Sequence, residues 1–315
     1  MKLHESNPID RNRADGRQDC GTRRAFLKRG ALFVPGVVGF AAAASSAARA
    51  ASSEEAKPAL RIGMMADVHY ADRQTAGSRH YRDSLVKVRE AVECFNGAKA
   101  DLAVELGDFI DAAPDVATEI GHLKRIDAEF SRFKGRRLYA LGNHCVHTLT
   151  KQEFIDNSGM SAAHYSLDMG GFHFVVLDAN YRSDGVAYGR KNSRWTDANI
   201  PQDQLDWLAA DLRQSKKTSI VFLHHRLEDV PPHSVKNAAA VRKVLEASGN
   251  VSAVFCGHSH RSHYAEIGGI HYCTLRALVE GPGIENGAYA LVDLFEDGSI
   301  RIDGFRMQED RQIEG

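Results

Sequence analysis

The chain has 315 residues, 43% of them hydrophobic and 26% charged, and its formal net charge is −1. These are the values of an ordinary globular protein that is long enough to bury a sizeable core. The first 50 residues have nine Lys or Arg and four Asp or Glu, so the rest of the chain has 31 basic and 37 acidic side chains. This mildly acidic body gives no electrostatic case for nucleic-acid binding, and we expect no nucleic-acid partner.

The first 50 residues look like an export signal. Residues 22–28 read TRRAFLK, which resembles the twin-arginine export motif; an apolar stretch follows over residues 31–44, and then a small-residue cleavage pattern at residues 48–50. A membrane-spanning helix needs about 20 apolar residues, so an N-terminal anchor helix is the weaker alternative. We therefore predict a twin-arginine signal over residues 1–50, cleaved on export by the twin-arginine machinery. The mature chain, residues 51–315, would be a single domain, periplasmic or extracellular, with no stable membrane anchor.

Cysteine is sparse. Cys20 lies in the predicted signal, and the body has Cys94, Cys145, Cys256 and Cys273. Four cysteines permit three complete pairings, and their spacing neither selects one of them nor matches a CxxC zinc pattern. Free or partly buried thiols are favoured over a disulfide framework, although an exported compartment permits disulfides.

Strands and helices alternate in the first half of the body. Apolar runs at residues 60–66, 101–106 and 137–141 predict buried strands. The segments between them, residues 81–95 and 115–133, have apolar side chains at helical spacing. This β-α-β-α-β order predicts an α/β sheet covered by helices.

The second half of the body begins with a hairpin, because residues 163–169 and 172–178 flank two glycines. Residues 180–201 are polar and predict a long loop, and long loops in compact domains tend to be functional or disordered. The remaining predicted elements are helices at residues 202–214 and 238–247 and strands at residues 219–223, 251–256, 270–274, 289–295 and 299–305.

Polar side chains follow five of the predicted strands, at the point where each strand ends. In open α/β sheets the loops beyond the carboxyl ends of the strands form the ligand crevice. If the five strands are neighbours in parallel segments of one sheet, we expect these side chains to converge on one rim. They are Asp67, His69, Asp108, Asp111, Asn143, His144, His224, His225, His258 and His260.

This set of donors predicts a metal site. Carboxylate, imidazole and amide groups suit Mn²⁺, Fe, Zn²⁺ or Co²⁺, and the near absence of cysteine argues against structural zinc. The candidates outnumber the ligands of one ion, so two ions that share a bridging carboxylate are favoured. Taken alone, the polar residues after any one strand have a simpler explanation; for example, an Asp at the end of a strand usually caps the next helix. It is the presence of such polar residues after all five strands, in this order, that indicates a metal site.

The series resembles the calcineurin-like metallophosphoesterase superfamily, whose motifs are D-x-H, G-D-x-x-D, G-N-H-[DE], H and G-H-x-H. The resemblance covers residues 62–305 and implies a four-layer αββα sandwich, in which two mixed sheets are flanked by helices. It implies that His144 contacts the phosphate or protonates the leaving oxygen, and that Asp111 supports the site without binding metal. The implied ligands are Asp67, His69 and His260 for one ion and Asn143, His224 and His258 for the other, with Asp108 bridging.

Two positions need separate treatment. His224 and His225 are adjacent, so strand alternation would place them on opposite faces, and we favour His224 because it directly follows the strand. Cys145 stands where the family usually has an acid that orients the neighbouring histidine. Because a thiol orients an imidazole poorly, we expect altered tuning of His144.

One branch of the superfamily is closer than the others. Residues 66–72 (ADVHYAD), 79–85 (RHYRDSL) and 285–289 (ENGAY) resemble the manganese-dependent ADP-ribose/CDP-alcohol diphosphatases. The resemblance implies two divalent ions (Mn, Fe or Zn, with Mn favoured) and attack by a metal-held hydroxide on a phosphodiester or phosphoanhydride of a nucleotide-like small molecule. The open alternatives are a phosphomonoesterase, which includes a protein phosphatase, and an exported protein that binds a phosphate ligand without hydrolysing it. The chain has no GxSxG elbow to support serine catalysis.

Overall fold

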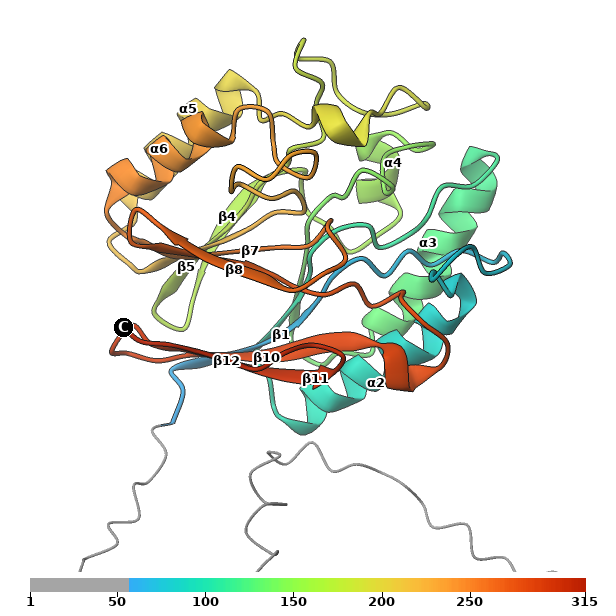
Figure 1. Ribbon diagram of the computed structural model, residues 1–315, viewed down its shortest axis with the longest axis horizontal. Coiled ribbons are helices and arrows are strands. Elements are labelled where there is room, and N and C mark those ends of the chain that lie inside the picture. Colours follow the sequence, from blue (N-terminus) through green and yellow to red (C-terminus); the bar gives the residue numbers. More distant parts are fainter. Residues whose placement is uncertain (1–56) are drawn as a thin grey trace, which may run out of the picture. The chain divides into compact units, whose positions relative to one another are not determined.

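The computed structural model describes residues 57–315, so the predicted export signal and its cleavage site lie outside the described residues. In the described part, two six-stranded sheets face each other, helices α5 and α6 cover the outer face of one sheet, and α2 and α3 lie on the side of the other (Figure 1). This arrangement is the αββα sandwich that the sequence predicts. No helix within residues 57–315 has the length and apolarity to cross a membrane.

Both sheets are mixed. The first has the order β12-β11-β10-β1-β2-β3 and the second the order β4-β5-β6-β7-β9-β8. Strands β1, β2 and β3 are parallel, as are β5, β6, β7 and β9, and the other neighbours are antiparallel. The strands are β1 (Leu60–Met65), β2 (Leu102–Glu105), β3 (Arg136–Tyr139), β4 (Tyr165–Met169), β5 (Phe172–Val176), β6 (Ser219–Phe222), β7 (Val251–Cys256), β8 (His263–Ile267), β9 (Ile270–Thr274), β10 (Ala288–Leu294), β11 (Ile300–Arg306) and β12 (Arg311–Ile313).

Helices α2, α3, α5 and α6 each join two consecutive parallel strands, whereas α4 lies between β3 and β4, which belong to different sheets. The helices are α2 (Ser84–Gly97), α3 (Val116–Phe130), α4 (Lys151–Asp156), α5 (Gln202–Gln214) and α6 (Ala238–Ser248), with 3-10 turns η1 (Tyr81–Asp83), η2 (Trp195–Asp197) and η3 (Ile284–Asn286). Helix α3 begins after Asp115, whose carboxylate accepts a hydrogen bond from the amide of Thr118. Helix α6 ends at Gly249, which has a φ of 69°.

The sheets pack through side chains that alternate along each strand. In β5, Phe172, Phe174 and Val176 belong to the core between the sheets, whereas Val175 belongs to the core under α5 and α6. The inter-sheet core also includes Ile62 and Leu102. Because side chains of both sheets interdigitate there, the edges of the two sheets hold a fixed position relative to each other.

Three short elements were not predicted: α4, β8 and β12. A signal for α4 was present, because Thr150 and Glu153 form a capping box at its start. Strand β8 lies at an edge and is exposed or half-buried along its length, and β12 has three residues, so neither has the apolar run that marks a core strand.

Candidate metal centre

The structure brings six of the seven predicted metal ligands together where the strands end, and the seventh, Asn143, is next to His144, which lies in the same cluster. Asp67, Asp108 and Asn143 follow β1, β2 and β3 of the first sheet, whereas His224 and His258 follow β6 and β7 of the second. The five strands are therefore not neighbours in one sheet, and the site lies where the edges of the two packed sheets meet. Three groups of side chains lie close enough to hold a metal ion: Asp67, His69 and His260; His69, Asp108 and His144; and Asp108, His224 and His258.

Five of these residues have an unusual backbone. A positive φ is uncommon for residues other than glycine and costs free energy, so its presence at several neighbouring positions indicates a functional constraint. The values are 52° at Asp67, 44° at His69, 56° at Asp108, 70° at His258 and 59° at His260. The chain thus turns sharply at the strand ends, where these side chains gather.

Glycine at position 142 permits the close approach of two of these loops. A Cβ atom on Gly142 would lie 2.1 Å from both the amide nitrogen and Oδ1 of Asp108. The amide of His144, two residues on, donates to the same Oδ1 over 2.7 Å. The loop formed by residues 142–144 therefore packs directly on Asp108 and fixes the position of its carboxylate.

The first group surrounds a small space between three ligating atoms. Nε2 of His69 and Nε2 of His260 lie 3.1 Å apart, and Oδ1 of Asp67 lies 3.7 Å and 3.5 Å from them. The amide of His258 donates to Oδ2 of Asp67 over 2.9 Å and holds that carboxylate in place. Ring nitrogens that face each other across such a distance, next to a carboxylate, are the donor set of a divalent cation.

Asp108 lies between the first group and the third, which consists of Asp108, His224 and His258. Its Oδ2 lies 3.1 Å from Nε2 of His224 and 3.5 Å from Nε2 of His69, which is the position of a bridging carboxylate. Two further donors are buried without a hydrogen-bond partner, Oδ1 of Asn143 and Nε2 of His258. A buried polar atom without a partner is costly, and metal binding would remove that cost. The residues present therefore fit two cations.

The charges of the site favour cations. Burial disfavours the charge of Asp108, but the neighbouring imidazoles, His224 first, hold the pKa of its carboxyl well below the usual range. Burial likewise opposes protonation of His224, yet Asp108 raises the pKa of that imidazole to about 9. A pocket that attracts protons so strongly also attracts divalent cations, which compete for the same nitrogen atoms.

His144 differs from its neighbours because its side chain is partly exposed while its ring is held by Asp111. Its Nδ1 lies 2.7 Å from Oδ1 of Asp111 and donates to it, and its side chain is 27% exposed, whereas His69 is fully buried. Burial opposes protonation of His144, but Asp108 and the hydrogen bond to Asp111 together raise its pKa above the usual value. The ring is thus fixed in one orientation with Nε2 free to face a ligand.

Comparison with known proteins gives the family. The calcineurin-like phosphoesterase family matches residues 60–262, which contain every residue of the three groups. The chain belongs to the calcineurin-like phosphoesterases. It is a metal-dependent hydrolase of that family, with a site of two-metal type.

Similar proteins extend over most of this phosphoesterase. It is 22% identical to a manganese-dependent ADP-ribose/CDP-alcohol diphosphatase of Arabidopsis thaliana, over 80% of this chain and 96% of the relative. It is 24% identical to the diphosphatase of the same name from Danio rerio, over 77% of this chain and 94% of the relative. The crystal structure of a dimetal phosphatase from Danio rerio has the same fold, with a TM-score of 0.72 and 22% identity over 82% of this chain and 99% of that one.

The choice between the adjacent histidines is decided by where β6 ends. The strand stops at Phe222, so alternation no longer applies, and the rings of His224 and His225 lie only 5.1 Å apart, both beside His258. Nε2 of His224 lies 3.1 Å from Oδ2 of Asp108, and His224 belongs to the third group of ligating side chains. His225 belongs to none of the three groups, although both of its ring nitrogens are buried without a partner. The geometry therefore favours His224 as the ligand.

The structure changes the expectation for Cys145. Its thiol is fully buried and accepts a hydrogen bond from the amide of Phe109 over 3.3 Å. Burial, and then the charge of Glu105, raises the pKa of Cys145 well above its usual value, so it remains a neutral thiol. Asp111, which is distant in sequence, orients His144 instead. The substitution of an acid by Cys145 therefore leaves His144 positioned.

We accordingly expect Cys145→Ala to keep kcat within about threefold of the unaltered enzyme and to cost about 1 kcal/mol of stability, because it removes a small buried group. Cys145→Asp would place a second buried carboxyl near Glu105 and should cost several kcal/mol, about 3–5 if it stays ionised. Thermal unfolding and steady-state rates measure both effects. Strong activation by Cys145→Asp would contradict this account.

Two supporting residues were not predicted, Glu280 and Lys87. Oε1 of Glu280 lies 2.6 Å from Nδ1 of His260 and fixes that ring with Nε2 toward the cluster. The buried Nζ of Lys87 donates to the carbonyl oxygens of Leu278, Glu280 and Gly281, and so holds the segment that carries Glu280. A signal for Lys87 existed, because it lies on the same face of α2 as the buried Val88 and Ala91.

Glu280→Gln is expected to weaken metal binding about 10–100-fold, since a carboxylate behind a ligating histidine raises its basicity and fixes its orientation. Activity of the metal-stripped protein, titrated against free Mn²⁺, measures the change. Glu285→Gln is the matched control because Glu285 is exposed. An unchanged titration curve for Glu280→Gln would show that His260 needs no such support or is not a ligand.

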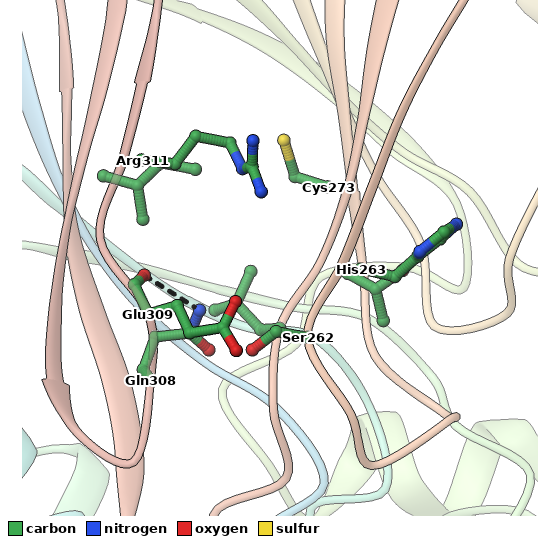
Figure 2. A pocket seen from close by; sticks show the side chains of 9 residues that line it. Ser262, His263, Cys273, Gln308, Glu309 and Arg311 are labelled. Carbon is green, nitrogen blue, oxygen red and sulfur yellow. Dashed lines mark hydrogen bonds between the residues drawn. The ribbon is translucent and has the colours of Figure 1, made fainter.

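A small pocket lies apart from this centre. Figure 2 shows it between strands of the two sheets, where Cys273 lies near Arg311, with Gln308 and Glu309 on the same side as Arg311. None of its lining residues belongs to the three groups of ligating side chains. It therefore contributes nothing to the metal centre.

Proposed function

We propose that this phosphoesterase hydrolyses a phosphoanhydride or phosphodiester bond in a nucleotide-like small molecule, such as ADP-ribose or a CDP-alcohol, with Mn²⁺ as the favoured ion. The observation that carries the proposal is the pair of ligand groups joined at Asp108, with the His144–Asp111 pair beside it. The printed activity of the two diphosphatases, which this chain matches over more than nine-tenths of their length, supports the substrate class.

The residues around the cluster favour a phosphorylated substrate. Arg73 and Arg79 lie 3.1 Å and 3.6 Å from Oδ2 of Asp111, and their side chains are 44% and 31% exposed. Each guanidinium therefore keeps donors available for phosphate oxygens beside His144. A neutral substrate would make no use of these cations.

The cations and the side chains would have different roles in the reaction. When bound, the two cations would polarise the phosphoryl group and lower the pKa of an attacking water. We assign Asp67, His69, Asp108, Asn143, His224, His258 and His260 to holding them. His144 would donate its Nε2 proton to the leaving oxygen or to a phosphoryl oxygen, with Asp111 holding its other nitrogen. Arg73 and Arg79 would bind the remaining phosphate charge.

A substrate panel tests the proposal. The purified protein is stripped of metal, reloaded separately with Mn²⁺, Fe²⁺ or Zn²⁺, and supplied with ADP-ribose, CDP-choline, a bis-aryl diester and an aryl monoester. The highest kcat/KM for ADP-ribose or CDP-choline would support it. Preference for the monoester would indicate a phosphomonoesterase, and tight retention of ligands without product would indicate a binding protein.

We also propose that the protein is exported, on the twin-arginine pattern of residues 22–28. Cell fractionation of the full chain, with Arg23→Lys and Arg24→Lys combined as the comparison, tests this. We expect a periplasmic product that begins near Ala51, and retention of the altered precursor. Equal export of both chains would contradict the proposal.

A further inference from the structure

Two aromatic side chains stand beside one of the assigned metal ligands. The ring of Trp195 lies 5.7 Å from the ring of His258, and the ring of His233 lies 5.4 Å from it. Trp195 and His233 also contact each other, with ring centroids 5.4 Å apart and an angle of 34° between the planes. They come from different loops, residues 180–201 and the segment after His225, so the contact is a product of the fold.

Trp195 remains accessible in this position. It is 44% exposed, although it contacts two rings. An aromatic side chain that is partly accessible beside a metal centre offers a flat face on which another ring can stack. His233 supports one part of the indole, and the exposed remainder is available for another flat group.

The loop that contains Trp195 is hydrogen-bonded to the loop that contains His144 and His147. Oγ of Ser193 lies 2.7 Å from Nδ1 of His147, three residues after His144, and the amide of Lys191 donates to the carbonyl oxygen of His147. The hydroxyl of the buried Tyr188 donates to the carbonyl oxygen of Arg194, next to Trp195. The indole is therefore held at a defined position relative to His144 and His258, as a substrate-binding group must be.

We propose that Trp195, backed by His233, forms a stacking subsite for a planar aromatic group, the nucleobase of the substrate, on the His258 side of the metal centre. Arg73 and Arg79 contact Asp111, beside the His69 and His144 end of the cluster. A base on Trp195 and a phosphate near these arginines would lie at opposite ends of the metal cluster. The inference rests on the proposed function and specifies which part of the substrate the long loop recognises.

A fluorescence titration tests the subsite without catalysis. The chain has two tryptophans, and the other, Trp207 on α5, packs against the core and the ring of His164. In Trp207→Phe, Trp195 is the only tryptophan. With metal bound, we expect CMP to quench its emission and ribose 5-phosphate, which has the same phosphate and no base, to leave it unchanged. Equal effects of the two compounds, or no effect of either, would overturn the proposal.

Kinetics of Trp195→Ala give the second readout. Stacking of one base on an aromatic side chain contributes about 1–3 kcal/mol, which corresponds to about 5–150-fold in kcat/KM. We expect a loss of that size for CDP-choline, no loss for the same compound without its cytosine ring, and partial recovery in Trp195→Phe. An equal loss for both substrates would show a structural role for Trp195 and refute the subsite. If no substrate is hydrolysed at all, the proposed function fails, while the titration still decides the subsite.

Discussion

Asp108→Ala is expected to lower kcat/KM by about 10³-fold or more, because a metal centre contributes several kcal/mol to transition-state stabilisation and each tenfold in rate is about 1.4 kcal/mol. Asp108 belongs to two of the three ligand groups, and its Oδ2 lies within 3.5 Å of nitrogens from both His69 and His224. Its removal therefore weakens both cation sites at once. Metal analysis should show fewer than two ions bound per chain.

Two variants separate this effect from misfolding. Asp108→Asn keeps an oxygen for the amide of His144 but removes the charge, so it should fold and still lose metal. Asp293→Ala is the control for a buried aspartate elsewhere, since Asp293 pairs with Arg61 and Arg301 away from the site. It should lower the unfolding temperature while both ions remain bound. Two tightly bound ions in Asp108→Ala would refute the bridging role.

His144→Ala is expected to reduce kcat by about 10²–10⁴-fold, the usual contribution of a positioned general acid, while both metal ions remain bound. The loss should be larger for substrates with poor leaving groups than for an aryl ester, because an aryloxide departs without needing a proton. His144 also clusters with His69 and Asp108, so the metal count distinguishes its roles. A fall from two bound ions to one would make it a ligand.

A variant of Asp111, which holds the ring of His144, gives a second test of the role of His144. Asp111→Asn should reduce kcat by less than His144→Ala, because the imidazole remains but loses its fixed orientation. The double variant should be no worse than His144→Ala alone, since two residues that act as one unit are not additive. Additive losses would mean that Asp111 acts on the substrate by another route, such as through Arg73.

Much of the fold could be read from local patterns. The core strands and the helices α2, α3, α5 and α6 were predicted because each has a clear apolar period or run, and the two hairpins were marked by glycine-containing turns. The elements that were missed are short or lie at sheet edges, where half-buried side chains leave no such pattern. The types of ligating side chain were also readable, because each follows a strand that the pattern predicts.

The supporting residues were harder to predict, because their contacts join distant parts of the chain. Cys145 is adjacent to His144 and was expected to tune it, yet the fold turns the thiol into the core and brings Asp111 to the imidazole. Glu280 lies 20 residues from His260, and no local pattern connects them. Trp195 was one residue of a long loop until the structure placed it against His258.

The sequence by itself determined which donors this protein has, that each follows a strand, and that there are enough of them for two ions. Local hydrophobic periodicity and backbone geometry are sufficient for that. Only the tertiary structure decided how close Oδ2 of Asp108 lies to the rings of His69 and His224, that Asp111 holds the ring of His144, and that Trp195 lies beside His258. These features depend on the packing of two sheets through one shared core, which is a property of residues far apart in the chain.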